Sequence, residues 1–298
     1  MPRLVKVFLR VVLGLIVLYV ALCAMGAVLA MRIPRLPLKG SPASAGLTYT
    51  DVSFPSRNSN FTLDGWFIPG TGNKTIIIVH GGFQNRLDEN VDTLDLTKSL
   101  VADGYNVLLF DLRGRGESQG TGLNILTNED DIGGAVDYLN SRGITTDDIG
   151  IIGFCSGAAS TAIFASQENV GAVVLDGCFA SVEMMVNRQA SERHIPTFLV
   201  DSFIPGLKIT VKLFFGAVPQ DPINVVPEIN CPVFFIHEQD DNLTSTQETD
   251  ELFAAAKNPA DEFWEIPGAL HSEGYKADPV DYVNKVNEFF CAELKGPS

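Results

Sequence analysis

The sequence predicts a layered α/β fold with a mostly parallel β-sheet and helices on both faces. Short, continuous apolar runs recur from residue 75 onward, which is typical of strands buried on both sides. Most of these runs are separated by stretches whose apolar residues recur at three- and four-residue spacing, the helical period. Two stretches of alternating polarity come before them, and the turn residues between the two indicate an antiparallel pair. Strands that alternate with helices in this order build a parallel sheet.

The predicted elements follow from these patterns in chain order. The strands are 48–54, 61–68, 76–79, 107–110, 149–152, 173–175, 233–236 and 263–266. The helices are 88–102, 129–141, 156–166, 245–256 and 279–294. Residues 181–228 interrupt the alternation, because prolines and irregular stretches separate two shorter helical patterns at 182–193 and 207–215. We interpret this segment as a small helical lid.

An apolar segment near the N-terminus is long enough to cross a lipid bilayer. Residues 11–31 carry no charge, and basic residues flank them on both sides. As a helix the segment would span about 30 Å, the thickness of a bilayer core. The apolar region of a cleaved signal sequence is usually only about 7–15 residues long. The sequence therefore favours an uncleaved, single-pass transmembrane anchor.

The anchor divides the chain into four parts. Residues 1–10 form a short N-terminal segment, 11–31 the anchor, 32–46 a linker rich in proline, glycine and serine, and 47–298 the folded domain with its lid. The flanking positive charges nearly balance, with a slight excess on the N-terminal side. This excess favours a cytoplasmic N-terminus, which would place the folded domain outside the cytoplasm.

Charge and cysteine usage restrict the class of partner. The formal net charge is −15 at pH 7, whereas nucleic-acid binding needs a concentrated basic surface. The cysteines outside the anchor show neither metal-ligand spacing nor the density of a disulfide framework. We therefore expect no nucleic-acid partner, no metal and no cofactor.

The motif Gly153-Phe154-Cys155-Ser156-Gly157 is the most informative segment of the chain. It ends an apolar run and opens a helical pattern of small residues, as a nucleophile elbow does. The central side chain of such a turn is exposed on a strained bend, so the residues two before and two after it must be small. Moving the frame to Ser156 would place the Phe154 ring at a crowded flank. The motif therefore indicates Cys155 as the nucleophile.

Other polar segments follow the predicted strands. Because ligands bind outside the carboxyl ends of parallel strands, residues directly after each apolar run are candidates for a site. These candidates are His80-Gly81-Gly82-Phe83, Asp111 to Ser118, Cys155, Asp176, His237 to Asp241, and His271.

These features together resemble the α/β-hydrolase family over residues 47–294. The resemblance is carried by the strand order, the histidine-glycine turn, the D-x-R-G-x-G-x-S segment at 111–118 and the elbow. The chain is similar to the branch of serine aminopeptidases and prolyl oligopeptidases, but its elbow cysteine is similar to that of dienelactone hydrolases. The resemblance implies the α/β-hydrolase fold and a triad whose members come in the order nucleophile, acid, histidine.

Cys155, Asp241 and His271 meet this order. A thiol is mostly protonated at neutral pH, so an adjacent imidazole is needed to take its proton and supply a thiolate. We expect His271 to be that base. A buried carboxylate behind the imidazole would fix its tautomer and stabilise its charged form, which is the role expected for Asp241.

The acid has two alternatives. The family pattern H-G-x-x-D matches residues 237–241, which favours Asp241 over its neighbour Asp240. Glu238 replaces the glycine of that pattern. Asp176, at the end of a neighbouring strand, is a further alternative, although a structural role is favoured for it.

The resemblance also implies an oxyanion hole. Backbone N–H donors stabilise the charge that develops on a carbonyl oxygen, typically by about 2.7–4 kcal/mol for one donor. We expect one donor to be the N–H of Ser156, directly after the nucleophile. The second is expected from Gly82, with Phe83 as the alternative, in the turn after His80.

The predicted function is hydrolysis of a small-molecule ester, lactone or thioester through an acyl-enzyme on Cys155. A thiolate is a good leaving group, which disfavours unactivated amides as substrates. One alternative is an acyltransferase that uses the same cysteine. Others are a serine-peptidase-like activity or a non-catalytic, membrane-tethered binding module with the same fold, since one fold hosts many functions.

Overall fold

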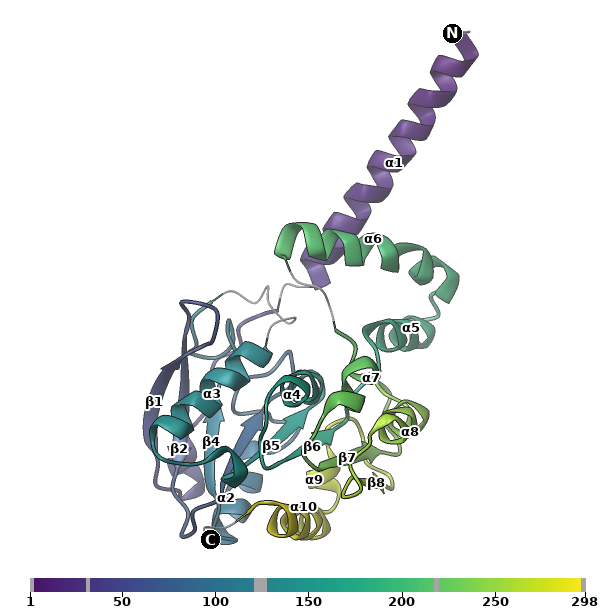
Figure 1. The fold of residues 1–298 in the computed structure, drawn as a ribbon. Coiled ribbons are helices and arrows are strands. Elements are labelled where there is room, and N and C mark those ends of the chain that lie inside the picture. The colour runs from purple at the N-terminus through teal and green to yellow at the C-terminus, as the bar shows by residue number, and fades with distance from the viewer. Residues whose placement is uncertain (1–2, 31–32, 121–127, 217–219, 296–298) are drawn as a thin grey trace.

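A computed structural model of the protein describes residues 3–30, 33–120, 128–216 and 220–295 (Figure 1). Its centre is an eight-stranded sheet with the order β1-β2-β4-β3-β5-β6-β7-β8. The strands are β1 Thr50–Pro55, β2 Thr62–Ile68, β3 Thr75–Val79, β4 Asn106–Phe110, β5 Ile149–Phe154, β6 Ala172–Asp176, β7 Val233–Glu238 and β8 Glu262–Ile266. The helices are α1 Arg3–Ala30, α2 Thr93–Ala102, α3 Glu129–Ser141, α4 Ser156–Gln167, α5 Val182–Glu192, α6 Thr197–Phe215, α7 Pro222–Val225, α8 Thr246–Ala255, α9 Gly274–Ala277 and α10 Pro279–Glu293.

The sheet is antiparallel only at its N-terminal edge. β2 pairs with β1 and β4 in antiparallel register, and all pairs from β4 through β8 are parallel. Every residue of β3, β5, β6 and β7 is buried, as expected of runs that are apolar on both faces. This arrangement confirms the predicted α/β fold.

Two apolar cores lie on opposite faces of the sheet. Ile77 and Val79 of β3 belong to a core that includes residues of α3, α4 and α8. Ile76 and Ile78 belong to the other core, which includes residues of α2 and α10. This alternation follows from the two-residue period of a strand, and it explains why β3 is apolar throughout.

The N-terminal part of α1 projects away from the domain, and its C-terminal part lies against α6 (Figure 1). Most of its residues are exposed, and its segment Arg3–Val28 is long and apolar enough to cross a membrane. Met31 and Arg32, at the boundary between the predicted anchor and linker, lie outside the described residues. The following segment contacts the domain: the Arg35 guanidinium donates to the carbonyls of Gly116 (2.8 Å) and Ser118 (2.7 Å).

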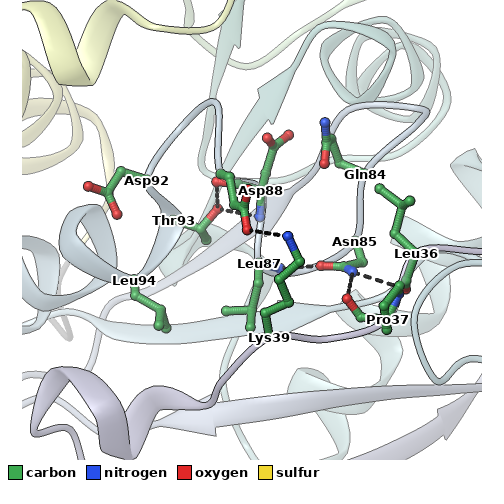
Figure 2. Close-up of a pocket in the computed structure, with 11 residues that line it drawn as sticks. Leu36, Pro37, Lys39, Gln84, Asn85, Leu87, Asp88, Asp92, Thr93 and Leu94 are labelled. Carbon is green, nitrogen blue, oxygen red and sulfur yellow. Dashed lines mark hydrogen bonds and ion pairs between the residues drawn. The ribbon is translucent and has the colours of Figure 1, made fainter.

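A cavity of about 180 Å³ lies where this segment meets the domain (Figure 2). Leu36, Pro37 and Lys39 form one wall, and residues from the segment before α2 and from its first turn form the other. The Asn85 amide donates to the carbonyls of Leu36 and Pro37. Among the described residues that line this cavity, none belongs to the predicted triad, so we do not assign the reaction to it.

Residues 181–228 form a helical segment of α5, α6 and α7 between β6 and β7, apart from residues 217–219, which lie outside the described part. α6 begins at Thr197, earlier than the predicted start at 207, because Pro205 lies inside the helix rather than before it. Proline removes one helical hydrogen bond and usually ends a helix. Here Tyr19 of α1 donates a hydrogen bond to the carbonyl of Ser202 (2.7 Å), next to the carbonyl that the proline leaves without its helical donor.

α2 begins at Thr93, later than the predicted start at 88. The Asp88 side chain accepts a hydrogen bond from the backbone N–H of Asn90 (2.9 Å), which favours a local turn over a helix. Asp92 has a φ of 56° and so lies outside the helical region. Helical periodicity alone could not reveal this turn.

Candidate active site

Cys155 lies on a strained turn between β5 and α4. Its φ of 54° and ψ of −119° are rarely adopted by a residue with a side chain. A Cβ at Gly153 would lie 2.6 Å from the Thr161 hydroxyl oxygen, and one at Gly157 would lie 2.5 Å from the carbonyl oxygen of Val79. Only glycine fits at these two flanks, so the bend has the geometry expected of a nucleophile elbow centred on Cys155.

The side chain of His271 is bonded to Asp241. Nδ1 of the imidazole lies 2.6 Å from Oδ2 of Asp241. The aspartate also accepts hydrogen bonds from the N–H groups of Leu243 (2.5 Å) and Thr244 (2.9 Å) and from the Thr244 hydroxyl (2.5 Å). Burial alone would raise the pKa of Asp241, but the bonds from His271 and Thr244 lower it. Asp241 is therefore an ionised carboxylate.

The environment of His271 favours the imidazolium. Burial would lower its pKa, but the hydrogen bond to Asp241 and the neighbouring Cys155 thiol raise the pKa to about 11. Nε2 is buried and makes no hydrogen bond within conventional distance and angle limits to any described residue. The thiol of Cys155 is thus a neighbour of the imidazole, but a hydrogen bond between the sulfur and Nε2 is not formed in this structure. Such contacts commonly tighten when substrate binds.

The alternative acids lie elsewhere. The Asp240 side chain is exposed, and its backbone N–H donates to the carbonyl of Ala269 (3.0 Å). Asp176 is fully buried at the end of β6, where its Oδ2 accepts a hydrogen bond from the hydroxyl of Tyr282 (2.7 Å). The structure therefore places Asp241, and neither alternative acid, against the imidazole of His271. Asp176 instead lies next to another buried carboxyl group.

That group is Glu238, the residue in place of the family's glycine. It is fully buried next to Asp176, and neither of its carboxyl oxygens has a hydrogen-bond partner among the described residues. Two neighbouring buried carboxyls do not both ionise readily, and the hydroxyl of Tyr282 stabilises the charge on Asp176. Burial, followed by the charge of Asp176, raises the pKa of Glu238 well above its usual value. Burial also raises the pKa of Asp176, but Glu238 is the carboxyl of the pair that favours its protonated form more strongly.

This pair lies directly beside the imidazole. A Cβ at Gly177 would lie 3.0 Å from Cε1 of His271 and 3.5 Å from Oε2 of Glu238. The single negative charge of the pair lowers the energy of a nearby imidazolium. Sequence patterns could not reveal the pair, because its carboxyls come from two neighbouring strands; the only signal was the departure from glycine at 238.

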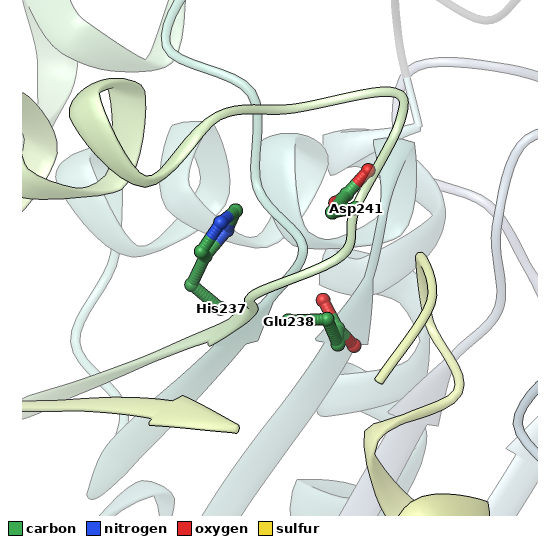
Figure 3. Close-up of side chains that lie close together, drawn as sticks. All are labelled: His237, Glu238 and Asp241. Carbon is green, nitrogen blue, oxygen red and sulfur yellow. The ribbon is translucent and has the colours of Figure 1, made fainter. Parts of the chain in front are cut away.

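His237, Glu238 and Asp241 offer possible metal-ligand atoms within 4.8 Å of one another (Figure 3). The residues present do not fit a cation. The Asp241 carboxylate already accepts four hydrogen bonds, and Glu238 holds a proton. Nδ1 of His237 contacts the Thr249 hydroxyl (3.3 Å). We therefore derive no step through a metal here.

Replacing Glu238 by glutamine is expected to stabilise the protein at neutral pH. Between the usual carboxyl pKa near 4.5 and its raised folded value, wild-type Glu238 holds a proton that the unfolded chain has lost. Wild-type stability should therefore fall with rising pH by up to about 1.4 kcal/mol per pH unit. Glutamine keeps a donor to Asp176 without titrating. The free energy of unfolding of both proteins is measured with denaturant at a series of pH values. The same dependence on pH in the two proteins would contradict this account.

The turn after β3 lies against the elbow. The N–H of Gln84 donates to the carbonyl of Gly81 (3.1 Å), which leaves the N–H groups of Gly82 and Phe83 at the two central positions of a turn. A Cβ at Gly82 would lie 2.5 Å from the Ser156 hydroxyl oxygen. The N–H of Ser156 itself opens α4, where the first amides have no intrahelical acceptor. The three predicted oxyanion residues therefore lie at one place.

Buried side chains hold this turn in position. Nδ1 of His80 contacts the carbonyl of Gly81 (2.7 Å), and its Nε2 accepts a hydrogen bond from the N–H of Leu112 (3.1 Å). Burial lowers the pKa of His80 to about 3, so the ring is neutral. Nε of Arg115 donates to the carbonyl of Gly82 (3.2 Å). Residues of the D-x-R-G-x-G-x-S segment thus hold the turn in place through hydrogen bonds.

α5 reaches the loop that carries the acid. The Arg188 guanidinium donates to the carbonyls of Asp241 (2.9 Å) and Asn242 (3.3 Å). This contact joins the helical segment to the site. Sequence reasoning missed it, because a lone arginine on a half-buried helix gives no signal of its partner.

Comparisons with known proteins agree with this geometry. A family model described as alpha/beta hydrolase fold matches residues 74–193. The uncharacterized protein YqkD of Bacillus subtilis (strain 168) is 28% identical over 226 residues, covering 72% of this chain and 70% of its own. The uncharacterized protein YfhR of Salmonella typhi is 26% identical over 286 residues, covering 89% and 87%.

The esterase Pf2001 of Pyrococcus furiosus is a similar solved structure. It has a TM-score of 0.74 and 26% identity, and the match covers 89% of this chain and 100% of the esterase. Sheet order, elbow, family-model match and structural likeness identify the chain as a protein of the α/β-hydrolase fold with an esterase among its structural neighbours.

Proposed function

We propose that the protein is a membrane-anchored hydrolase that cleaves esters, lactones or thioesters through an acyl-enzyme on Cys155. The observation that carries the proposal is the alignment of Asp241 and His271 behind a thiol on a strained elbow. The esterase neighbour supports an ester as the bond that is cleaved. A cysteine at the elbow favours activated acyl groups over amides, because a thiolate leaves a tetrahedral intermediate more easily than an amine does.

The reaction proceeds in two stages. The thiolate of Cys155, whose proton is held on His271, attacks the carbonyl carbon and forms a tetrahedral intermediate. The intermediate collapses to a thioester as the imidazolium gives its proton to the leaving alcohol or thiol. Water then attacks the thioester while His271 accepts a proton from it, and collapse of the second intermediate releases the acid and restores the thiolate–imidazolium pair. Asp241 remains ionised throughout.

The oxyanion is stabilised by backbone donors of Ser156 and the turn after β3. Replacing Gly82 by proline removes its N–H at the position of a turn that accepts proline. We expect kcat to fall by about 10²–10³-fold. The matched control is Gly82→Ala, with both changes made in a Ser156→Ala background so that the new side chain meets no hydroxyl. Equal rates for the two variants would remove Gly82 from the role and leave Phe83.

The enzymatic proposal is tested with p-nitrophenyl acetate. The full chain in detergent is expected to release a burst of p-nitrophenol equal to the enzyme concentration, followed by slower turnover if hydrolysis of the thioester limits the rate. Products formed in the presence of a competing amine distinguish hydrolysis from acyl transfer. A protein that shows neither burst nor turnover with activated esters and thioesters would be a binding module instead.

The anchor is the helix α1. Its exposed, apolar surface is suited to a lipid environment, and the charge excess at its N-terminal side favours a domain outside the cytoplasm. Protease added to intact cells is therefore expected to digest the domain; a domain that stays intact until the membrane is opened would reverse this orientation.

A further inference from the structure

α6 presents an apolar face that is largely exposed. Phe198, Leu199, Ile209, Leu213 and Phe214 are 65%, 44%, 61%, 76% and 72% exposed. With Pro205, residues 198, 209 and 213 recur at the spacing that places side chains along one side of a helix. Aromatic and aliphatic side chains in such a stripe are costly to leave in water.

Another side of α6 packs against α1. The rings of Tyr19 and Phe203 are stacked with centroids 5.5 Å apart. A Cβ at Gly206 would lie 2.4 Å from Sγ of Cys23, and one at Gly26 would lie 3.2 Å from the Leu207 side chain. The two helices therefore approach closely through small residues, a mode of packing common between helices in membranes.

The level of this contact along α1 determines where α6 lies. Tyr19 and Gly26 come about 16 and 6 Å before the end of α1 at Ala30, at 1.5 Å per residue. If α1 crosses a bilayer, as the proposed function holds, its C-terminal half lies in one leaflet. α6 crosses α1 at that level (Figure 1), so its exposed stripe lies in this leaflet, between the headgroups and the middle of the hydrocarbon core.

The polar groups of α6 suit such a position. Asp201 accepts a hydrogen bond from Asn187 (2.9 Å), and Lys208 pairs with Glu183 (3.4 Å), so both point to α5. The hydroxyls of Ser202 and Thr210 donate to carbonyls of α6 itself, at 2.7 Å each. Lys212 is exposed next to the stripe and makes no side-chain hydrogen bond or ion pair among the described residues, and its long side chain can extend to the lipid headgroups.

We propose that α6 lies in the leaflet nearest the folded domain, with its apolar stripe in contact with lipid, and that the active site takes acyl esters dissolved in the membrane. α6 packs on α5, and Arg188 of α5 bonds the loop of Asp241. Through α5, the active site is thus connected to a helix that lies in the membrane. Interfacial helices of this kind bury their apolar face about 5–10 Å into the headgroup and acyl boundary.

Fluorescence quenching in vesicles tests the contact without relying on activity. The full chain is reconstituted in phosphatidylcholine with or without bromine on the acyl chains, and the two native tryptophans give a constant background. Leu213→Trp reports on α6 and Leu13→Trp on the anchor. Val280→Trp is the matched control, because Val280 is also exposed (72%) but lies on α10, at the opposite end of the molecule from α1 (Figure 1).

Loss of most of the added emission is expected for Leu213→Trp and Leu13→Trp, and none for Val280→Trp. Quenching at residue 13 alone would overturn the proposal and indicate that water or a second copy covers α6. No quenching at residue 13 would overturn the anchor itself, and with it the basis for α6. Quenching at residue 280 would indicate unspecific adsorption of the domain and also count against the proposal.

The substrate class is tested with Leu213→Asp and Val280→Asp. The ratio of activity on a long-chain acyl ester in vesicles to activity on p-nitrophenyl acetate in solution is expected to fall for Leu213→Asp and to keep the wild-type value for Val280→Asp. An unchanged ratio for both would overturn the lipid-borne substrate. Absence of any hydrolysis by the wild type would instead contradict the proposed function, and the quenching result would still stand.

Discussion

Replacing Cys155 by alanine is expected to lower kcat for p-nitrophenyl acetate by about 10⁴–10⁶-fold, as loss of a triad nucleophile does in hydrolases of unrelated folds. The reason is that in the proposed mechanism the thiolate forms the covalent intermediate, and alanine leaves only transition-state binding by the oxyanion donors. Steady-state and burst kinetics of the full chain measure this loss. The burst should vanish together with the turnover.

The matched control for this variant is Cys291→Ala. Cys291 is also a free thiol and is exposed, so it would show any unspecific acylation of cysteines by an activated ester. The burst should survive in Cys291→Ala. A burst that persists in Cys155→Ala and disappears in Cys291→Ala would contradict the proposed mechanism.

Asp241→Asn is expected to reduce kcat by about 10⁴-fold while leaving the elbow intact. An amide can donate to Nδ1 and so favours the imidazole tautomer with its proton on Nε2, where it cannot accept one from Cys155. Asp240→Asn is the matched control, because Asp240 is adjacent in the same loop but exposed. Comparable losses in the two variants would indicate a disturbed loop rather than a lost carboxylate.

The same substitution also changes stability in a pH-dependent way. A histidine whose pKa is raised in the folded state stabilises the protein most below its unfolded value near 6.5, and this contribution disappears as the pH rises through the folded value of about 11. Asp241→Asn should therefore destabilise the protein at neutral pH, with a deficit that narrows towards pH 11. This narrowing distinguishes a lost ion pair from simple loss of packing.

The sheet and the elbow could be predicted from the sequence because each depends on local patterns. Apolar runs locate the buried strands within one or two residues, and the two glycines of the elbow follow from close contacts that no other residue allows. The order in which Cys155, Asp241 and His271 occur is a property of chain topology. Their meeting at one sheet edge follows from parallel strands that all end there.

Other features depend on contacts between distant segments. The early start of α6 requires a partner for the helix around Pro205, which α1 supplies through Tyr19. The proximity of Glu238 and Asp176 requires two neighbouring strands, β6 and β7, to end side by side. Neither contact leaves a periodic signal in the sequence. The sequence did contain one sign of this site, because Glu238 stands where the H-G-x-x-D pattern has glycine.

Mass spectrometry of a trapped acyl-enzyme tests the central claim most directly. The full chain is mixed with an activated acyl ester, quenched in acid during the burst, digested and mapped by fragmentation between the adjacent candidates Cys155 and Ser156. We predict a single acyl group on the sulfur of Cys155, released by hydroxylamine at neutral pH as a thioester is. An acyl group on the hydroxyl of Ser156, or none on either residue, would contradict the account.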